Sequence, residues 1–137
     1  MSRSIQRGAL AMFVALLAGA CGGADNLIAP TTPAPVPISE LFSGTLTRNA
    51  AITHPFATQA GGTVTATLTS VSPNAVIGIS LGTWNGIACQ IVIANDSAVQ
   101  SSTVTGTASA VGNLCLRVYD VGQFTEATSY EVSVFHP

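Results

Sequence analysis

Residues 63–69 read TVTATLT, an unbroken alternation of apolar and hydroxyl side chains. A period of two places Val64, Ala66 and Leu68 on one face of an extended strand and the four threonines on the other. Threonine is β-branched, so it favours an extended backbone while its hydroxyl stays in water. The stretch therefore predicts a β-strand whose solvated face is built from hydroxyl groups and not from charges.

The same alternation recurs along the chain from Ser43 onward, and turn-forming residues separate the runs. The pair Asn85-Gly86, set between two apolar runs, is the strongest hairpin indication in the sequence. About eight short strands at this spacing predict an all-β domain, an antiparallel β-sandwich or jelly roll. The predicted strands cover residues 44–48, 55–58, 63–69, 76–81, 88–94, 102–108, 114–120 and 130–135.

Charge is scarce throughout the 137 residues. Only four residues are basic, all of them arginine, and six are acidic, while 47% of the chain is hydrophobic. A nucleic-acid-binding protein needs a basic patch, and a charge-driven disordered protein needs far more charge. The composition therefore excludes both classes, and the length fits one domain of ordinary size.

The first twenty residues have the layout of a secretory signal. Arg3 and Arg7 precede an apolar run at residues 9–18, and small residues follow it. The run is shorter than the roughly 20 apolar residues that span a bilayer. Residues 1–20 are therefore predicted to be a signal peptide. Their removal leaves two arginines against six carboxylates, a mildly acidic protein with formal charge −4.

Residues 16–21, LLAGAC, resemble the lipobox of bacterial lipoproteins, although Ala18 stands where that motif most often has leucine. The resemblance implies that Cys21 is acylated and becomes the mature N-terminus. It places the protein in the bacterial cell envelope, anchored by lipid. Gly22 after the cysteine favours the outer membrane, with the domain facing the periplasm or the exterior. The alternative is an ordinary cleavage after Ala20 that leaves Cys21 as a free thiol.

Residues 21–39 are predicted to be the lipidated cysteine and a flexible Pro/Thr-rich tether. Residues 22–37 hold four of the seven prolines, and proline removes backbone donors and fixes φ, so neither helix nor sheet is expected there. A proline-rich recognition motif is the alternative interpretation. Residues 40–137 are predicted to form the β-sandwich domain.

Three cysteines are an odd number for an exported chain, and setting Cys21 aside leaves Cys89 and Cys115 as a pair. An oxidising compartment favours a disulfide between them. Closing the loop between residues 89 and 115 is expected to stabilise the fold by roughly 3–4 kcal/mol, because it reduces the conformational entropy of the unfolded chain. The alternative is a pair of buried free thiols.

Residues 112–122, GNLCLRVYDVG, and residues 130–134, YEVSV, resemble the closing hairpin of bacterial pre-peptidase C-terminal-type domains. These domains are small jelly-roll sandwiches appended to secreted peptidases and other exported proteins. The resemblance implies a non-catalytic accessory or binding module and carries over no catalytic residue. The chain differs from many of these domains in its cysteine pair. Earlier pieces follow the same order at residues 44–46, 55–56, 60–64 and 77–81, so that the resemblance covers residues 42–136.

The sequence has no His-Glu-x-x-His pair or phosphate-binding loop. Residues 78–82, GISLG, match Gly-x-Ser-x-Gly in letters, but they belong to a predicted strand with no helical pattern after it, whereas the nucleophile elbow needs a strand-to-helix turn. His54 precedes a proline at a strand entry and His136 lies beside the C-terminal Pro137. Both are predicted to be surface or strand-end residues. The expected protein is not an enzyme and requires no cofactor.

Calcium is the metal that such a domain would most reasonably bind, and it takes six to eight oxygen ligands. Asp96, Asp120 and Glu126 are the candidate carboxylates. The alternative is that Asp96 caps a turn and Asp120 lies at a solvated strand end.

Trp84 directly precedes the predicted hairpin turn and is the candidate ligand-binding residue. An indole at that place can stack on a sugar ring or on a partner's apolar surface. The alternative is a tryptophan folded over the sheet. Arg117 alternates with apolar neighbours, so it is predicted to point away from the core and to pair with Asp120 or Glu131.

The expected function is a non-catalytic, lipid-anchored binding or interaction module of the envelope, whose ligand the sequence does not specify. One alternative is a carbohydrate-binding module that uses Trp84 and a Ser/Thr-rich face. Another is a structural or accessory domain of an envelope or secreted-peptidase assembly, which predicts an exposed apolar patch. The membrane, an envelope protein or a glycan are the expected partners, and nucleic acid is not.

Overall fold

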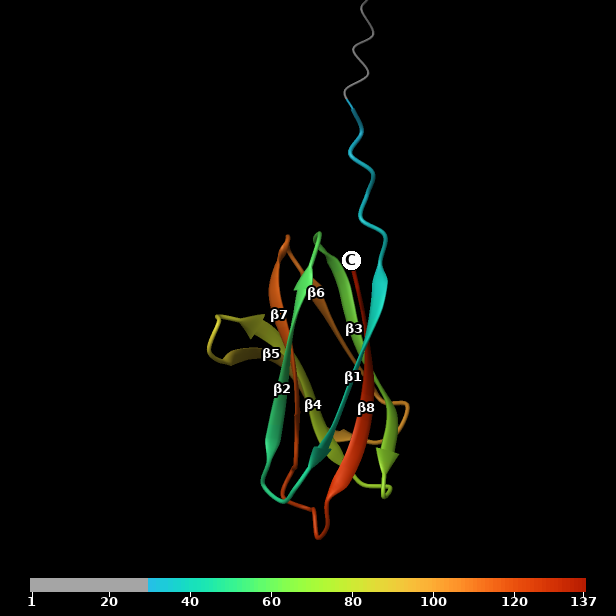
Figure 1. The fold of residues 1–137 in the computed structure, drawn as a ribbon, viewed down its shortest axis with the longest axis vertical. Helices are drawn as coiled ribbons and strands as arrows, with labels where there is room; N and C mark the ends of the chain where they lie inside the picture. Colours follow the sequence, from blue (N-terminus) through green and yellow to red (C-terminus); the bar gives the residue numbers. More distant parts are fainter. Residues whose placement is uncertain (1–29) are drawn as a thin grey trace, which may run out of the picture. The chain divides into compact units, whose positions relative to one another are not determined.

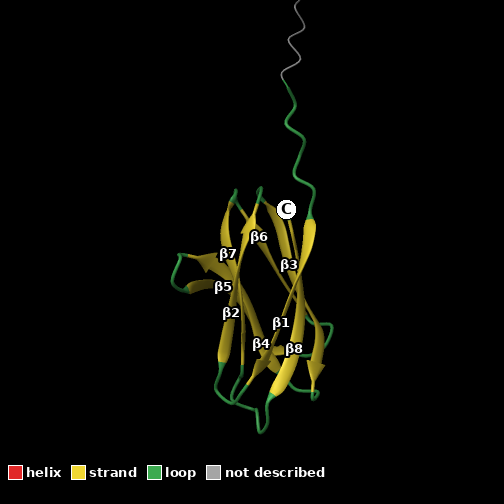
Figure 2. Cartoon of the chain, in the orientation of Figure 1, coloured by secondary structure: helices red, strands yellow, loops and turns green. Residues whose placement is uncertain are grey.

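The structure is a computed structural model that describes residues 30–137. The predicted signal peptide, Cys21 and the first part of the tether lie outside the described residues. Over residues 30–137 there are strands and loops but no helix (Figure 2). No helix of this part of the chain is long and apolar enough to cross a membrane. The eight strands are β1 (Ile38–Leu46), β2 (Ala51–Thr58), β3 (Gly62–Ser72), β4 (Ile77–Trp84), β5 (Cys89–Ala98), β6 (Thr103–Ala108), β7 (Gly112–Tyr119) and β8 (Thr128–His136).

The strands form two four-stranded antiparallel sheets within one compact unit, Pro33–Pro137 (Figure 1). One sheet has the order β1-β8-β3-β6 and the other β2-β7-β4-β5. Most successive strands therefore cross from one sheet to the other, which is the arrangement of an eight-stranded jelly roll. The predicted fold class is confirmed.

The core lies between the two sheets and follows the alternation in the sequence. Val64, Ala66 and Leu68 on β3 are buried, as the TVTATLT stretch predicts. From the other sheet, Ile79 of β4 and Leu116 of β7 are buried in the same cluster. Side chains that leave water in this way supply the main stabilisation of the fold, at roughly 25 cal/mol per Å² of apolar surface.

The outer face of the β1-β8-β3-β6 sheet is built from hydroxyl groups, as predicted. Thr65 of β3 lies opposite Thr105 of β6, and their hydroxyl oxygens are 3.3 Å apart. Thr69 donates to the carboxylate of Glu131 on β8. Threonine rows thus provide most of the polar groups on this face, beside the carboxylate of Glu131.

The first strand begins earlier than predicted, at Ile38 instead of Gly44, while Arg48 lies in a turn. β1 pairs with β8 along its whole length, from Ile38 opposite His136 to Leu46 opposite Thr128. This long-range pairing makes a strand of residues whose own pattern is weak. Residues 38–39, predicted as the end of the tether, therefore belong to the sheet.

The histidines were predicted to be surface or strand-end residues, and this is right only in part: His136 ends β8 but is buried, and His54 is half-buried in the middle of β2. His136 is 0% exposed, and its Nε2 lies 3.0 Å from Oε1 of Glu40. His54 faces the interior from β2, and its Nε2 lies 2.7 Å from the hydroxyl oxygen of Tyr130. The strand period turns both rings inward, where each finds a polar partner that offsets the cost of burial. Phe56 packs against the His136 ring, with centroids 5.0 Å apart.

Burial lowers the pKa of His54 below its ordinary value of 6.5. Burial also raises the pKa of Tyr130 to about 12, so its hydroxyl stays protonated and can donate to the Nε2 atom of a neutral His54. The folded protein then takes up a proton at His54 less readily than the unfolded chain does. The contribution of His54 to stability is therefore complete above the unfolded pKa and is lost as the pH falls below it.

A His54→Gln substitution, which retains an amide oxygen to accept from Tyr130, is expected to flatten the loss of stability between about pH 7 and pH 5. Urea unfolding at both pH values, for the wild-type protein and the variant, measures the effect. The same pH slope in both proteins would contradict the role of His54.

Candidate functional site

The turn between β4 and β5 is held by its first residue, Asn85. Its side-chain oxygen accepts hydrogen bonds from the backbone N–H groups of Ile87, at 2.9 Å, and Ala88, at 2.8 Å. Gly86 has a φ of 94°, in the left-handed region that glycine adopts without strain. The hairpin predicted from Asn85-Gly86 is thus confirmed, with a loop that extends over residues 85–88. It projects to the left of the two sheets in Figure 1.

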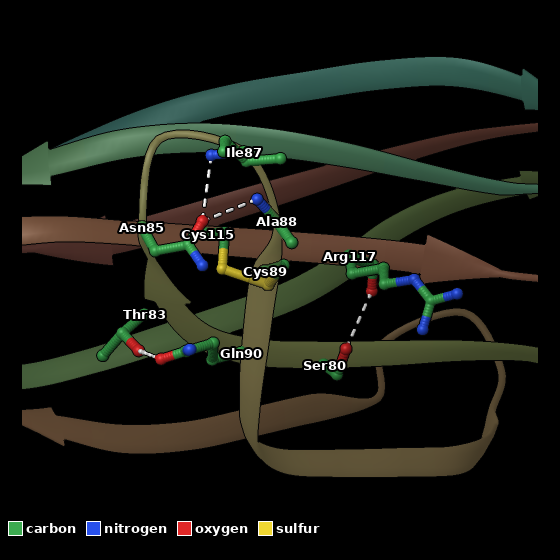
Figure 3. The surroundings of a disulfide bond; sticks show 9 residues. All are labelled: Ser80, Thr83, Asn85, Ile87, Ala88, Cys89, Gln90, Cys115 and Arg117. Atoms are coloured by element: carbon green, nitrogen blue, oxygen red, sulfur yellow. Dashed lines mark hydrogen bonds between the residues drawn. A yellow bond between two sulfur atoms is a disulfide. The ribbon is translucent and has the colours of Figure 1, made fainter.

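A disulfide between Cys89 of β5 and Cys115 of β7 fixes this hairpin, as predicted (Figure 3). β4 lies between these strands in the sheet, so the disulfide spans it. Cys115 alternates with the core residues Leu114 and Leu116 and so faces the outside of the sheet, yet it is 0% exposed. Because Cys89 and the hairpin cover it, the bond holds the hairpin against the outer face.

Gly82 of β4 makes this crossing possible. It is paired with Cys115 on one side and with Ile91 on the other. A Cβ atom at Gly82 would lie far inside the contact distance of the backbone carbonyl of Gln90. A side chain here would push β5 away, so glycine is required for the close approach of the two strands.

The fixed hairpin and β5 expose several aliphatic side chains. Ile87 is 89% exposed and Val92 is 76% exposed, and Ile91 and Ile93 are also exposed. No charged residue occurs between residues 84 and 95. Since β5 is the edge strand of its sheet, these exposed side chains are apolar, uncharged and carried on a rigid support.

Trp84 lies at the end of β4 on the outer face of the same sheet, where it is partly exposed. It is neither a buried lid nor a fully exposed loop tip. The indole contributes to an open depression with two amide side chains, Asn85 and Asn113. The whole lining is Pro55, Phe56, Ala57, Trp84, Asn85, Gly86 and Asn113.

The amide groups of this depression are available to a ligand. Within residues 30–137 the side chain of Asn113 has no hydrogen-bond partner, and it is exposed. Asn85 uses its oxygen for the turn, which leaves its NH₂ group to donate. We refer to Trp84, Asn85 and Asn113 together as the Trp84 site.

Trp84 and the threonine rows are on the outer faces of different sheets. Trp84 and the threonine rows therefore do not share one site, while carbohydrate binding itself stays a prediction. The two faces are separated by the core, and a ligand on one does not reach the other.

Asp120, one of the candidate calcium ligands, holds together the turn in which it lies. One oxygen of Asp120 accepts from the backbone N–H groups of Gly122, Gln123 and Phe124, and the other accepts from that of Asn49 at 2.8 Å. Desolvation acts to raise the pKa of the Asp120 carboxyl, but these hydrogen bonds outweigh it and hold the pKa below its usual value. Asp120 is thus the centre of the turn that follows β7.

Asp96 accepts a hydrogen bond from the hydroxyl of Tyr119. Desolvation and this carboxylate together raise the pKa of Tyr119 to about 12. In the part of the chain that the structure describes, no three His, Cys, Asp or Glu side chains gather as metal ligands. Asp96, Asp120 and Glu126 therefore do not form the group that the calcium hypothesis needs.

Arg117 points away from the core, as predicted, but it pairs with neither predicted carboxylate. Its guanidinium carbon lies 5.3 Å from the centre of the Tyr119 ring, a cation–π contact. Asp120 is occupied by backbone donors, and Glu131 lies on the other sheet. The Tyr119 ring occupies the space that a side chain at Gly78 would fill. The sequence did not reveal this position of the ring, because Gly78 and Tyr119 lie on different strands.

The chain matches no protein-family model, and no curated protein is significantly similar to it. The resemblance to pre-peptidase C-terminal-type domains therefore stays a prediction. What the structure adds is the jelly-roll order and a disulfide-fixed hairpin beside an aromatic site.

Proposed function

We propose that this protein is an exported, lipid-anchored, non-catalytic binding module of the bacterial envelope, and that the β4–β5 hairpin is its contact element. The observation that carries the proposal is that uncharged apolar side chains are exposed on a rigid support. Ile87 and Val92 are the most exposed large apolar residues of a hairpin fixed by Cys89 and Cys115. A surface that is already ordered loses less entropy on binding than a mobile loop.

Export and anchoring are supported by separate features of the chain. A disulfide is stable in an oxidising compartment, which agrees with a signal peptide at residues 1–20. Acylation of Cys21 followed by a proline-rich tether would hold the domain at some distance from the lipid.

The non-catalytic assignment is supported by the way the histidines are engaged. Half-buried His54 contacts the hydroxyl of Tyr130, and fully buried His136 contacts the carboxylate of Glu40. A general base must instead reach a substrate proton at a surface that the substrate can approach. The two histidine rings instead pack against aromatic side chains between the sheets.

Cross-linking in intact envelopes tests the proposal. A photoreactive amino acid at Ile87 of the full chain is expected to give adducts that excess wild-type protein suppresses. The matched control is the same amino acid at Val111, which is 69% exposed in the loop before β7. Equal adduct yields at both positions would overturn the assignment of the hairpin.

The anchoring part of the proposal is tested in the same cells. A Cys21→Ser variant is expected to leave the membrane fraction, since it lacks the acylated thiol. Full partition of this variant with the membrane would overturn anchoring through Cys21.

A structural role in an envelope assembly is the second candidate, because the exposed aliphatic residues of the hairpin are the apolar patch that it requires. Under that role, adducts at Ile87 form with one protein in fixed proportion.

A further inference from the structure

We propose that the Trp84 site binds one ring of a neutral saccharide. This inference rests on the proposed binding function and names the ligand class of one site beside the hairpin. It is carried by an aromatic ring and two amide groups that converge on one open depression from β4, the β4–β5 turn and β7.

The chemistry of the depression matches the two kinds of surface on a pyranose ring. The C–H groups of one face of the ring pack against an indole, and Trp84 is partly exposed at that place. The hydroxyl groups at the rim of a sugar both donate and accept hydrogen bonds. Asn113 offers an amide that does both, and Asn85 offers its NH₂ group as a donor.

The absence of charge selects a neutral sugar over an acidic one. None of the seven residues that line the depression is charged. An acidic sugar would bring a carboxylate or sulfate to a place with no cationic side chain to offset its desolvation. A protein ligand fits less well, because the depression alternates amides with apolar groups instead of offering one apolar pocket.

The groups of the site are held in place before a ligand arrives. Two backbone hydrogen bonds fix Asn85, and the disulfide ties the strand after the turn to β7, two residues from Asn113. Because these groups are already fixed, less conformational entropy is lost when a ligand binds. Because the depression is open and shallow, the fitting ligand is a ring within a glycan chain, with weak affinity for each copy of the protein.

Trp84 is the single tryptophan of the chain, so its fluorescence reports on the site directly. The full chain, purified in a mild detergent, is titrated with tetrasaccharides of β-linked glucose or N-acetylglucosamine and, separately, with a tetrasaccharide of uronic acid. A saturable shift in emission is expected with at least one neutral tetrasaccharide, and weaker or no binding is expected with the acidic one.

Two asparagine variants separate a binding role from a structural one. Asn113→Ala is expected to weaken binding by about fivefold, the effect of losing one or two hydrogen bonds. The matched control is Asn74→Ala, which removes an exposed asparagine in the loop before β4, at the end of the strand opposite Trp84. Its affinity is expected to equal that of the wild-type protein.

The inference is overturned if no neutral tetrasaccharide shifts the emission, if the acidic one binds more tightly, or if Asn113→Ala binds as well as Asn74→Ala. Its failure is distinct from failure of the proposed function. If Ile87 gives specific cross-links but no tetrasaccharide changes the emission, saccharide binding is rejected and the proposed binding function stands. If Ile87 and Val111 cross-link equally, the assignment of the hairpin as the contact element is rejected.

Discussion

Replacement of both Cys89 and Cys115 by alanine is expected to lower the free energy of unfolding by about 3.5 kcal/mol. The disulfide joins residues that are 26 positions apart, and the loop that it closes restricts the unfolded chain far more than the folded one. The loss is a large fraction of the 5–15 kcal/mol that typically stabilises a domain, so the variant is expected to unfold at much lower denaturant concentration.

Urea unfolding of the wild-type protein, the double variant and the reduced wild-type protein measures this loss. The last two are expected to agree within about 1 kcal/mol, because both lack the same constraint. Hydrogen exchange is also expected to accelerate most in β5, which the disulfide ties down, and least in β3, at the centre of the other sheet. A double variant as stable as the wild-type protein would show that packing alone holds the hairpin.

Replacement of Gly82 by alanine is expected to destabilise the fold by about 3 kcal/mol, at the upper end of the effect of overpacking. The new methyl group would collide with the carbonyl of Gln90, which belongs to the backbone and cannot rotate away as a side chain would. β5 must therefore shift, and the shift works against the disulfide that holds it.

The matched control for Gly82 is Gly106 on β6, also a strand glycine. A Cβ atom at Gly106 would meet only a methyl group of Ile93, at 3.7 Å, an ordinary contact. Gly106→Ala is expected to be neutral or stabilising by less than about 1 kcal/mol, since it restricts the unfolded chain. Equal destabilisation by the two substitutions would show that loss of glycine, and not the collision at Gln90, is the cause.

The strands could be predicted from the sequence because their signal is local. The TVTATLT stretch shows its buried and its solvated face within seven residues, and Asn85-Gly86 marks a turn by its backbone preferences alone. The start of β1 at Ile38 was missed because it depends on pairing with β8, near the other end of the chain.

The site was predicted only in part. Trp84 was singled out because an indole beside a turn is unusual, but Asn113 was not, because an asparagine after a glycine looks like any turn residue. Their proximity depends on the order β2-β7-β4-β5, which places β7 beside β4. The histidines were misplaced for a related reason: a polar ring can face inward only where a distant strand supplies its partner, as Tyr130 and Glu40 do.

The sequence by itself determined the class of the fold and the hydroxyl-covered sheet, which follow from residue type and a period of two, and the cysteine pair, which follows from the number of cysteines. Tertiary structure alone decided that the β4–β5 hairpin lies over Cys115, that Trp84 meets Asn113, and that the Ser/Thr-rich face is on the opposite sheet. The physical reason is that register between distant strands fixes which side chains share a face, and register is a property of the assembled sheets and not of any one segment.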